Sequence, residues 1–472
     1  MNSWIKCENC QGRGKKSRRI RKKKRLLYRK QFELFEKDRS KRSEPIPPKG
    51  HLDNCSTCSG RGIMPSEEPP KSDISNYPKV AIIGGGIGGV ALAVACLHRG
   101  IPFTLYERDI SFNTRSQGYG LTLQQASKAI EGLGIISLKE GVVSNRHLVH
   151  NTDGKVVAEW GMRKWVHSNY KKSPKKTNIH ISRQSLRLAL IEQLGGINNI
   201  KWGHQLINIE STKNKDLKLT FNVNGSTINS KADLVIGADG IRSSVRKLLI
   251  GDESLPLRYL GCIVILGICP LANIENIKSE LLDSATVFQT ANGKERIYVM
   301  PFSSDSVMWQ LSFPISEKDA KALNKKGPKV LKKEAIKRTK WHAPIPQIVS
   351  STLEDQVSGY PVYDRALLKP ELLKKLTRCT LIGDAAHPMS PFKGQGANQA
   401  LLDALSLARE ISKGCRPQAK WREFGIRENV LNSFELEMLE RSAKKVKDSA
   451  DAADFLHSDV VLYESNEPRK KM

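Results

Sequence analysis

The sequence predicts an α/β protein built on a Rossmann-like parallel sheet, because three short apolar segments each run into a turn that contains glycine. The first is Val80–Gly89 (Val-Ala-Ile-Ile-Gly-Gly-Gly-Ile-Gly-Gly), and the other two begin at Asp233 and Cys379. In each, a strand-like run is followed by a turn and then by a helix-like segment, which is the order of elements in a βαβ unit. A chain of 472 residues is long enough for about three domains.

The first turn has the spacing of a dinucleotide-binding fingerprint. Gly84, Gly86 and Gly89 match G-x-G-x-x-G, in which glycine allows a sharp turn, a close approach to a pyrophosphate, and tight packing of helix on strand. The N-terminus of the following helix offers N–H groups to phosphate. A second apolar strand ends at Glu107, about 20 residues further on, where an acidic side chain binds ribose hydroxyls. The motif alone leaves open which dinucleotide is bound.

The second and third segments place acidic residues in their turns. Asp239 and Gly240 follow one apolar strand, and Asp384 follows the other. Asp384 can bind a sugar or ribityl hydroxyl. Gly394–Gly396 precedes a further helix, whose N-terminus can lie near an anionic ring or a phosphate.

Taken together, the three blocks resemble the single-component, aromatic-hydroxylase class (class A) of FAD-dependent monooxygenases. The resemblance spans about residues 78–415. It rests on Gly84, Gly86 and Gly89, on Asp239-Gly240 with Ser243, Val245 and Arg246, and on Gly383–His387 with Pro391, Gly394 and Gly396. It implies a discontinuous FAD-binding domain at about 76–150, 180–250 and 355–415. A mainly β substrate layer at about 151–179 and 255–350 would complete a body of residues 76–415.

The resemblance also implies site residues. Glu107 would hold the adenosine ribose, Asp384 the ribityl–pyrophosphate part of FAD, and Asp239 would support the pyrophosphate and the use of NAD(P)H. Arg115 and Arg183 are candidates for FAD contacts, with ordinary surface cations as the alternative. His387 is expected to be a packing residue, and no catalytic side chain is assigned. The expected cofactor-binding set is Gly84, Gly86, Gly88, Gly89, Glu107, Arg108, Arg115, Arg183, Asp239, Gly240, Asp384, Pro391, Gly394, Gln395, Gly396, Ala397 and Asn398.

The sequence has no second glycine fingerprint, so we expect FAD to be bound permanently and NAD(P)H to bind only briefly. The resemblance then implies that NAD(P)H reduces the flavin and that O2 adds at its C4a atom. The hydroperoxide would transfer one oxygen atom to a small aromatic or polyketide-like substrate. Two alternatives stay open. One is an FAD-dependent reductase or dehydrogenase of the same fold, and the other is an interaction protein in which the flavin domain acts as a sensor.

Residues 1–75 predict a small zinc-binding module. The pattern C-x-x-C-x-G-x-G occurs twice, at Cys7–Gly14 and Cys55–Gly62. The thiolates of Cys7, Cys10, Cys55 and Cys58 would complete one tetrahedral, structural zinc site with no open position. The repeats resemble the cysteine-rich repeats of DnaJ-type chaperones, although this chain has two repeats rather than four. A pair of disulfides or free thiols are the alternatives.

A strongly basic run, Lys15–Arg25, separates the two repeats, in a chain whose net charge is +29. Tyr28, Phe32 and Phe35 follow at helical spacing and predict a basic helical arm. We expect this arm to be a solvated helix between the two halves of the zinc module. Contact with a nucleic acid or a protein partner, which a basic surface would attract, is the alternative.

The remaining expectations concern the substrate layer and the chain ends. Strands are expected near 262–268, 285–289, 296–301 and 307–313, with Met300, Met308, Trp309 and Phe313 either lining a pocket or packing in the core. Residues 416–472 form a C-terminal segment that should be helical from Glu428 to Leu456. The chain starts without an apolar leader, has no apolar run long enough to cross a bilayer, and has nine cysteines. These features predict a cytoplasmic protein in a reducing compartment, without a transmembrane segment.

Overall fold

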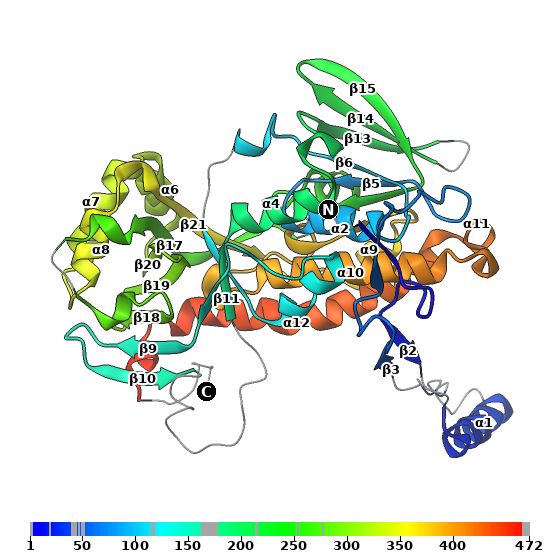
Figure 1. The fold of residues 1–472 in the computed structure, drawn as a ribbon, viewed down its shortest axis with the longest axis horizontal. Helices are drawn as coiled ribbons and strands as arrows, with labels where there is room; N and C mark the ends of the chain where they lie inside the picture. Colours follow the sequence, from blue (N-terminus) through cyan, green and yellow to red (C-terminus); the bar gives the residue numbers. More distant parts are fainter. Residues whose placement is uncertain are drawn as a thin grey trace.

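The computed structural model describes residues 3–17, 20–38, 45, 48, 52–114, 119–161, 178–212, 216–251, 253, 255–275 and 278–464. The α/β part is built on a five-stranded parallel sheet in the order β12-β6-β5-β16-β22, of which Figure 1 labels β5 and β6. The three segments that predicted the fold therefore form adjacent strands, and their turns meet at one edge of the sheet. The strands are β5 (Val80–Ile83), β6 (Phe103–Tyr106), β12 (Ile200–Lys201), β16 (Leu234–Gly237) and β22 (Cys379–Leu381).

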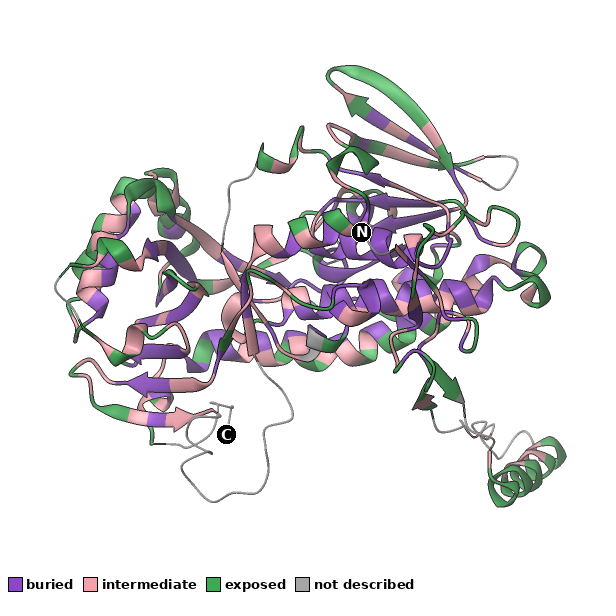
Figure 2. Ribbon diagram, in the orientation of Figure 1, coloured by how far each residue is buried: buried purple, intermediate pink, exposed green. Residues whose placement is uncertain are grey.

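Helix α2 is the most deeply buried helix of this domain (Figure 2), because its sequence is almost entirely small and apolar. It packs against α10, and the close approach depends on small residues: a Cβ atom at Gly88 would lie 3.3 Å from Cβ of Ala400. The α/β class predicted from the sequence is thus confirmed. The helices around the sheet are α2 (Ile87–Leu97), α4 (Arg183–Gln193), α5 (Ser244–Ile250), α9 (Pro370–Lys374) and α10 (Gly396–Gly414).

A seven-stranded sheet forms the second layer, in the order β10-β9-β18-β19-β20-β17-β21. Its residues alternate between two faces. Ile297 and Val299 pack against helices α6, α7 and α8 on one face, whereas Tyr298 and Met300 point to the other. The strands are β9 (Arg146–His150), β10 (Val156–Trp160), β17 (Leu257–Pro270), β18 (Thr286–Ala291), β19 (Arg296–Ser303), β20 (Ser306–Pro314) and β21 (Val357–Arg365), and the helices are α6 (Glu317–Lys325), α7 (Pro328–Arg338) and α8 (Ile345–Ser351).

The sheet corrects the expected bounds of the substrate layer and separates the four pocket candidates. The substrate layer extends beyond 151–179 and 255–350, because β9 pairs with β18 and β21 pairs with β17. Residues 146–150 and 357–365 had been expected in the FAD-binding part. Of the four pocket candidates, Met300 and Met308 line the cavity described below, whereas Trp309 and Phe313 are buried among the residues that face the helices.

Two smaller sheets and a long helix complete the body. Helix α12 packs against α10 and β17, and it follows a short π-helix, Arg427–Leu431. These helices confirm the expected helical segment at 428–456. The strands are β7 (Gly120–Leu123), β8 (Val142–Ser144) and β11 (Asn178–Ser182) in one sheet and β13 (Gln205–Ser211), β14 (Leu217–Val223) and β15 (Ser226–Ala232) in the other, and the helices are α11 (Trp421–Phe424) and α12 (Asn432–Phe455).

The N-terminal residues form two short antiparallel pairs next to the body, and between them a helical arm projects away (Figure 1). The arm is α1 (Lys22–Lys37), as its aromatic spacing predicts, and none of its residues is buried. Arg115 lies outside the described residues. No helix in the described part of the chain is long and apolar enough to cross a membrane. The strands are β1 (Ser3–Lys6) with β4 (Ile63–Ser66), and β2 (Lys15–Ser17) with β3 (Leu52–Asn54).

Candidate cofactor and substrate site

A cavity of about 1650 Å³ lies between the turns of the parallel sheet and the seven-stranded sheet. Ligand pockets commonly measure about 300–1,000 Å³, so this one has room for a dinucleotide together with a small substrate. One wall comes from the expected cofactor residues: Gly86, Gly88, Arg183, Gly240, Asp384, Pro391, Gly394, Gln395, Gly396 and Ala397. The opposite wall comes from the sheet: Leu266, Ile268, Val287, Gln289, Arg296, Tyr298, Met300, Met308 and Gln310.

The first glycine turn is shaped by contacts that exclude any side chain. Gly84 has a φ of +109°, and a Cβ atom there would lie 2.6 Å from the Ala238 carbonyl oxygen. A Cβ atom at Gly89 would lie 1.8 Å from the carbonyl oxygen of Gly84. At Gly86 the nearest protein atom would be 3.9 Å away, on Arg183, so this position opens onto the cavity. Two of the glycines therefore form the turn, and Gly86 leaves room for a ligand.

Glu107 and Arg187 hold this turn in place from outside the cavity. Glu107 is buried, and its Oε2 accepts a hydrogen bond of 2.6 Å from the Gly85 N–H. Arg187 Nε donates a hydrogen bond of 2.7 Å to the Gly85 carbonyl oxygen. Arg108 is exposed and does not line the cavity. Sequence reasoning missed Arg187, whose only signal is its position one turn of α4 after Arg183.

Asp239 lies beside the cavity rather than in its wall. Its carboxylate accepts hydrogen bonds from the backbone N–H groups of Ser244 (2.6 Å) and Val245 (3.2 Å) and from the Ser243 hydroxyl. It therefore satisfies the N-terminus of α5. Burial raises its pKa even though these hydrogen bonds oppose the shift. Arg246, in the first turn of α5, donates a hydrogen bond of 3.0 Å to the Ala385 carbonyl oxygen and so links the second block to the third.

In the third block, Asp384 lines the cavity. The cavity walls shield its carboxylate from bulk water, and this loss of solvation raises its pKa. The residue before it is held by Asp403 of α10, whose Oδ2 accepts a hydrogen bond of 2.8 Å from the Gly383 N–H. The same oxygen lies 2.7 Å from His387 Nε2, and Oδ1 accepts a hydrogen bond of 2.9 Å from Arg441.

His387 and Asp403 are fully buried and titrate as a pair. Burial alone lowers the pKa of His387, but the charge and hydrogen bond of Asp403 outweigh it and raise that pKa above its ordinary value. Burial alone raises the pKa of Asp403, but His387, Arg441 and the Gly383 N–H together hold it below its ordinary value. Sequence reasoning placed His387 correctly in the packed interior and missed its partner, Asp403.

The other expected residues near the third block have separate roles. Asn398 is buried outside the cavity wall. Its Nδ2 donates to the carbonyl oxygens of Thr122 and Gly394, both at 2.8 Å, and its Oδ1 accepts a hydrogen bond of 2.9 Å from the Gln124 N–H. It therefore fixes the Gly394 turn against β7. Arg183 is half-buried, lies 5.5 Å above the Tyr119 ring, and lines the cavity.

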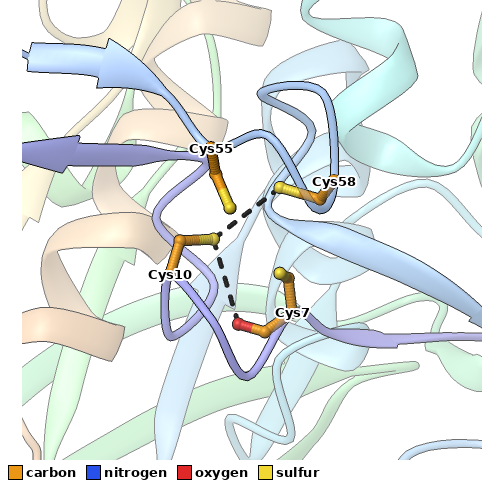
Figure 3. A group of neighbouring side chains, drawn as sticks. All are labelled: Cys7, Cys10, Cys55 and Cys58. Carbon is orange, nitrogen blue, oxygen red and sulfur yellow. Dashed lines mark hydrogen bonds between the residues drawn. The ribbon is translucent and has the colours of Figure 1, made fainter.

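The four cysteines of the N-terminal repeats converge at one buried point (Figure 3). Their sulfur atoms all lie within 4.8 Å of one another, and none of the nine cysteines forms a disulfide. The two repeats make equivalent contacts. The Cys7 N–H donates to the Gly62 carbonyl oxygen and the Cys55 N–H to that of Gly14, both at 2.9 Å. The Gly14 and Gly62 N–H groups donate to Cys10 Sγ and Cys58 Sγ, both at 3.2 Å.

Known proteins resemble this chain in sequence and in fold. Residues 77–424 match the family described as FAD binding domain. Over 75% of its length, the chain is 27% identical to the aurachin C monooxygenase/isomerase of Stigmatella aurantiaca, of which it covers 86%. Over 71% of its length, the chain is 26% identical to the 6-hydroxynicotinate 3-monooxygenase of Pseudomonas fluorescens, and it covers 83% of that protein. The structure of Klebsiella pneumoniae HpxO with FAD and uric acid gives a TM-score of 0.65 at 20% identity, over 81% of this chain and 90% of that one.

These matches confirm two expectations. The family covers most of the chain and all three turn blocks, which confirms FAD as the cofactor. Relatives along the same region are monooxygenases, which confirms the predicted enzyme class, an FAD-dependent monooxygenase. The chain belongs to the FAD binding domain family.

Proposed function

We propose that the protein uses NAD(P)H and O2 to hydroxylate a small aromatic or polyketide-like molecule bound against the seven-stranded sheet. The observation that supports this most directly is the cavity, which joins the cofactor wall to a mostly apolar wall of the sheet. Bound FAD would accept a hydride from the nicotinamide and activate O2, so that one oxygen atom enters the substrate and the other leaves as water.

The chain's own residues would bind, orient and exclude water. Gly86 leaves space at the N-terminus of α2, whose backbone N–H groups would bind a pyrophosphate. Asp384 offers a carboxylate to hydroxyl groups, and Gly394–Gly396 places the N-terminus of α10 at the cavity. The apolar surface that would exclude water from the reacting centre comes from the sheet, through Leu266, Val287, Met300 and Met308.

The test combines oxygen labelling with a substrate panel. We expect purified protein to contain FAD and to oxidise NADPH or NADH faster when an accepted substrate is present. One atom from isotopically labelled O2 should appear in the product. Substrate-stimulated oxidation without any incorporation of label would contradict hydroxylation and favour the reductase alternative.

Arg296 suggests the charge of the substrate. It is 5% exposed and lines the cavity, its Nε donates a hydrogen bond of 2.6 Å to Gln289, and its guanidinium lies 5.0 Å from the Tyr298 ring. Burial lowers its pKa to about 10, so it remains charged at neutral pH, and no described carboxylate contributes to that pKa. A buried cation calls for a counter-charge. We therefore propose that the substrate carries a carboxylate, phenolate or enolate.

Replacing Arg296 by methionine should raise the KM for such a substrate and leave the FAD content unchanged. A hydrogen bond to a charged group contributes about 1.5–3 kcal/mol, which corresponds to a loss of about 10- to 150-fold in kcat/KM. Arg296→Lys, which keeps the charge, should lose less. Steady-state kinetics on paired acids and methyl esters provides the measurement, and an unchanged preference for the acid would rule out this role.

We also propose that the four clustered cysteines bind one structural zinc ion. The buried sulfur atoms, the two equivalent N–H···S contacts and the repeated glycines support a closed tetrathiolate site. Inductively coupled plasma mass spectrometry of the purified protein should find one zinc ion per chain. The double variant Cys7→Ser/Cys55→Ser should bind none. Cys269→Ser, a buried cysteine outside the cluster whose Sγ donates to the Pro270 carbonyl oxygen, should keep the metal. Zinc-free wild-type protein from zinc-supplemented cultures would contradict the assignment.

A further inference from the structure

The cysteine cluster is attached to the body through two arginines that occupy equivalent places. Arg99, just after α2, donates from Nε to the Gly12 carbonyl oxygen (3.2 Å). Arg409, in the second half of α10, donates to the Gly60 carbonyl oxygen (3.1 Å). Gly12 and Gly60 are the same position of the two C-x-x-C-x-G-x-G repeats. Each repeat therefore receives one guanidinium from one helix.

Both guanidinium groups are shielded from water, Arg99 more fully than Arg409, which is half-buried. Arg99 is 2% exposed, and one of its terminal nitrogens and the Nε of Arg409 are buried without any hydrogen-bond partner among the described residues. In the described part of the chain, neither arginine forms an ion pair with a carboxylate. The ionisable groups that act on them are the thiols of Cys10 on both and of Cys58 on Arg409, with Cys96 and Tyr77 also acting on Arg99. Four neutral thiols would leave the buried charge of Arg99 and the partly buried charge of Arg409 uncompensated, which destabilises the folded state. A zinc ion with four thiolates has a net charge of −2 and matches them.

Arg99 directly follows α2 and Arg409 lies on α10, and both of these helices begin at the cofactor wall. Helix α2 starts at the glycine turn, and α10 starts at Gly396. At 1.5 Å per residue, the two arginines lie about 18–20 Å along the helix axes from the helix N-termini. Arg99 also donates from a terminal nitrogen to the Ala95 carbonyl oxygen (2.9 Å), so it satisfies the C-terminal end of α2 as well.

We propose that a zinc tetrathiolate, neutralised by Arg99 and Arg409, fastens the far ends of α2 and α10, and that loss of the metal weakens FAD binding at their near ends. The ligand of the new site is a divalent cation that prefers four thiolates. The inference rests on the proposed zinc and on FAD as the cofactor. It adds that the two sites are energetically coupled, because both act on the same pair of packed helices.

The experiment measures FAD affinity, not turnover. Full-length apoflavoprotein is titrated with FAD by flavin fluorescence, first zinc-loaded and then after treatment with a chelator. We expect the FAD dissociation constant to rise about tenfold without zinc, a typical size for coupled sites, and to recover when zinc is added back. An unchanged dissociation constant would overturn the coupling. A zinc-loaded protein that binds no FAD would instead overturn the proposed function.

Variants that remove the arginine charges test the coupling between zinc and FAD even if the zinc-free chain unfolds. The double variant Arg99→Met/Arg409→Met keeps all four cysteines and should bind both zinc and FAD more weakly. The double variant Arg99→Lys/Arg409→Lys, which keeps both charges, should retain more of both affinities. Arg416→Met is the matched control, because this exposed arginine lies just after α10 and, in the described structure, its side chain donates a hydrogen bond only to the Lys413 carbonyl oxygen. If the Met/Met variant binds zinc and FAD as the wild type does, the arginines do not couple the two sites.

Discussion

Replacing Gly89 by alanine is expected to leave the purified protein without bound FAD. The new Cβ atom would lie 1.8 Å from the carbonyl oxygen of Gly84, a distance that no packing adjustment of side chains can relieve. The first turn of α2 would have to move away from β5, and the pyrophosphate-binding N–H groups would move with it. The ratio of FAD to protein, measured from the absorbance spectrum after gel filtration, reports the loss directly.

Gly86→Ala separates the effect on the turn from the effect on the ligand. Its Cβ atom would meet no protein atom closer than 3.9 Å, so the chain should fold with wild-type stability. The same atom would occupy space through which the backbone approaches FAD, so affinity should still fall. We therefore expect both variants to lose FAD and only Gly89→Ala to unfold at a lower temperature. A Gly89→Ala protein with full FAD occupancy would show that this turn is not the binding site.

Replacing Asp403 by alanine should cost about 3–5 kcal/mol of unfolding free energy, the usual penalty for breaking a buried charge pair. The change removes the acceptor for the Gly383 N–H, for His387 and for Arg441 at once. Asp403→Asn keeps an oxygen for the Gly383 N–H but loses the charge, so its loss should be smaller. Urea unfolding followed by circular dichroism gives both values, and equal stability of Asp403→Ala and wild type would refute the role.

The same pair predicts how stability depends on pH. The pKa of His387 is raised in the folded state, so its contribution is fully present below its ordinary value of 6.5 and is lost as the pH rises through the folded value. The pKa of Asp403 is lowered, so its contribution is present above its ordinary value of 3.8 and is lost as the pH falls. Asp403→Asn should therefore flatten the decline in stability of the wild type above pH 6.5, whereas a parallel decline would argue against the pair.

The sequence alone predicted the features that depend on residues close together in the chain. The glycine turns, the four cysteines and the helical arm each depend on residues a few positions apart, so their spacing carries the information. Asp239 shows the limit of that approach: its motif is recognisable, but only the structure shows that its carboxylate satisfies α5. Arg187 and Asp403 could not be found from spacing, because each acts on a segment that is distant in the chain. The positions of β9 and β21 were missed for the same reason, since hydrogen bonds between distant strands decide which sheet they join.

The pairing of β2 with β3 has a consequence for the arm. Lys15 lies opposite Asn54, and Ser17 lies opposite Leu52, so the chain leaves the cysteine cluster and returns to it at neighbouring points. The entropy of closing such an excursion grows only with the logarithm of its length, by about 0.6 kcal/mol for each doubling. The length and composition of the arm are therefore nearly free of folding constraints. A short turn or an inserted domain in place of α1 should be compatible with the same two cysteine repeats.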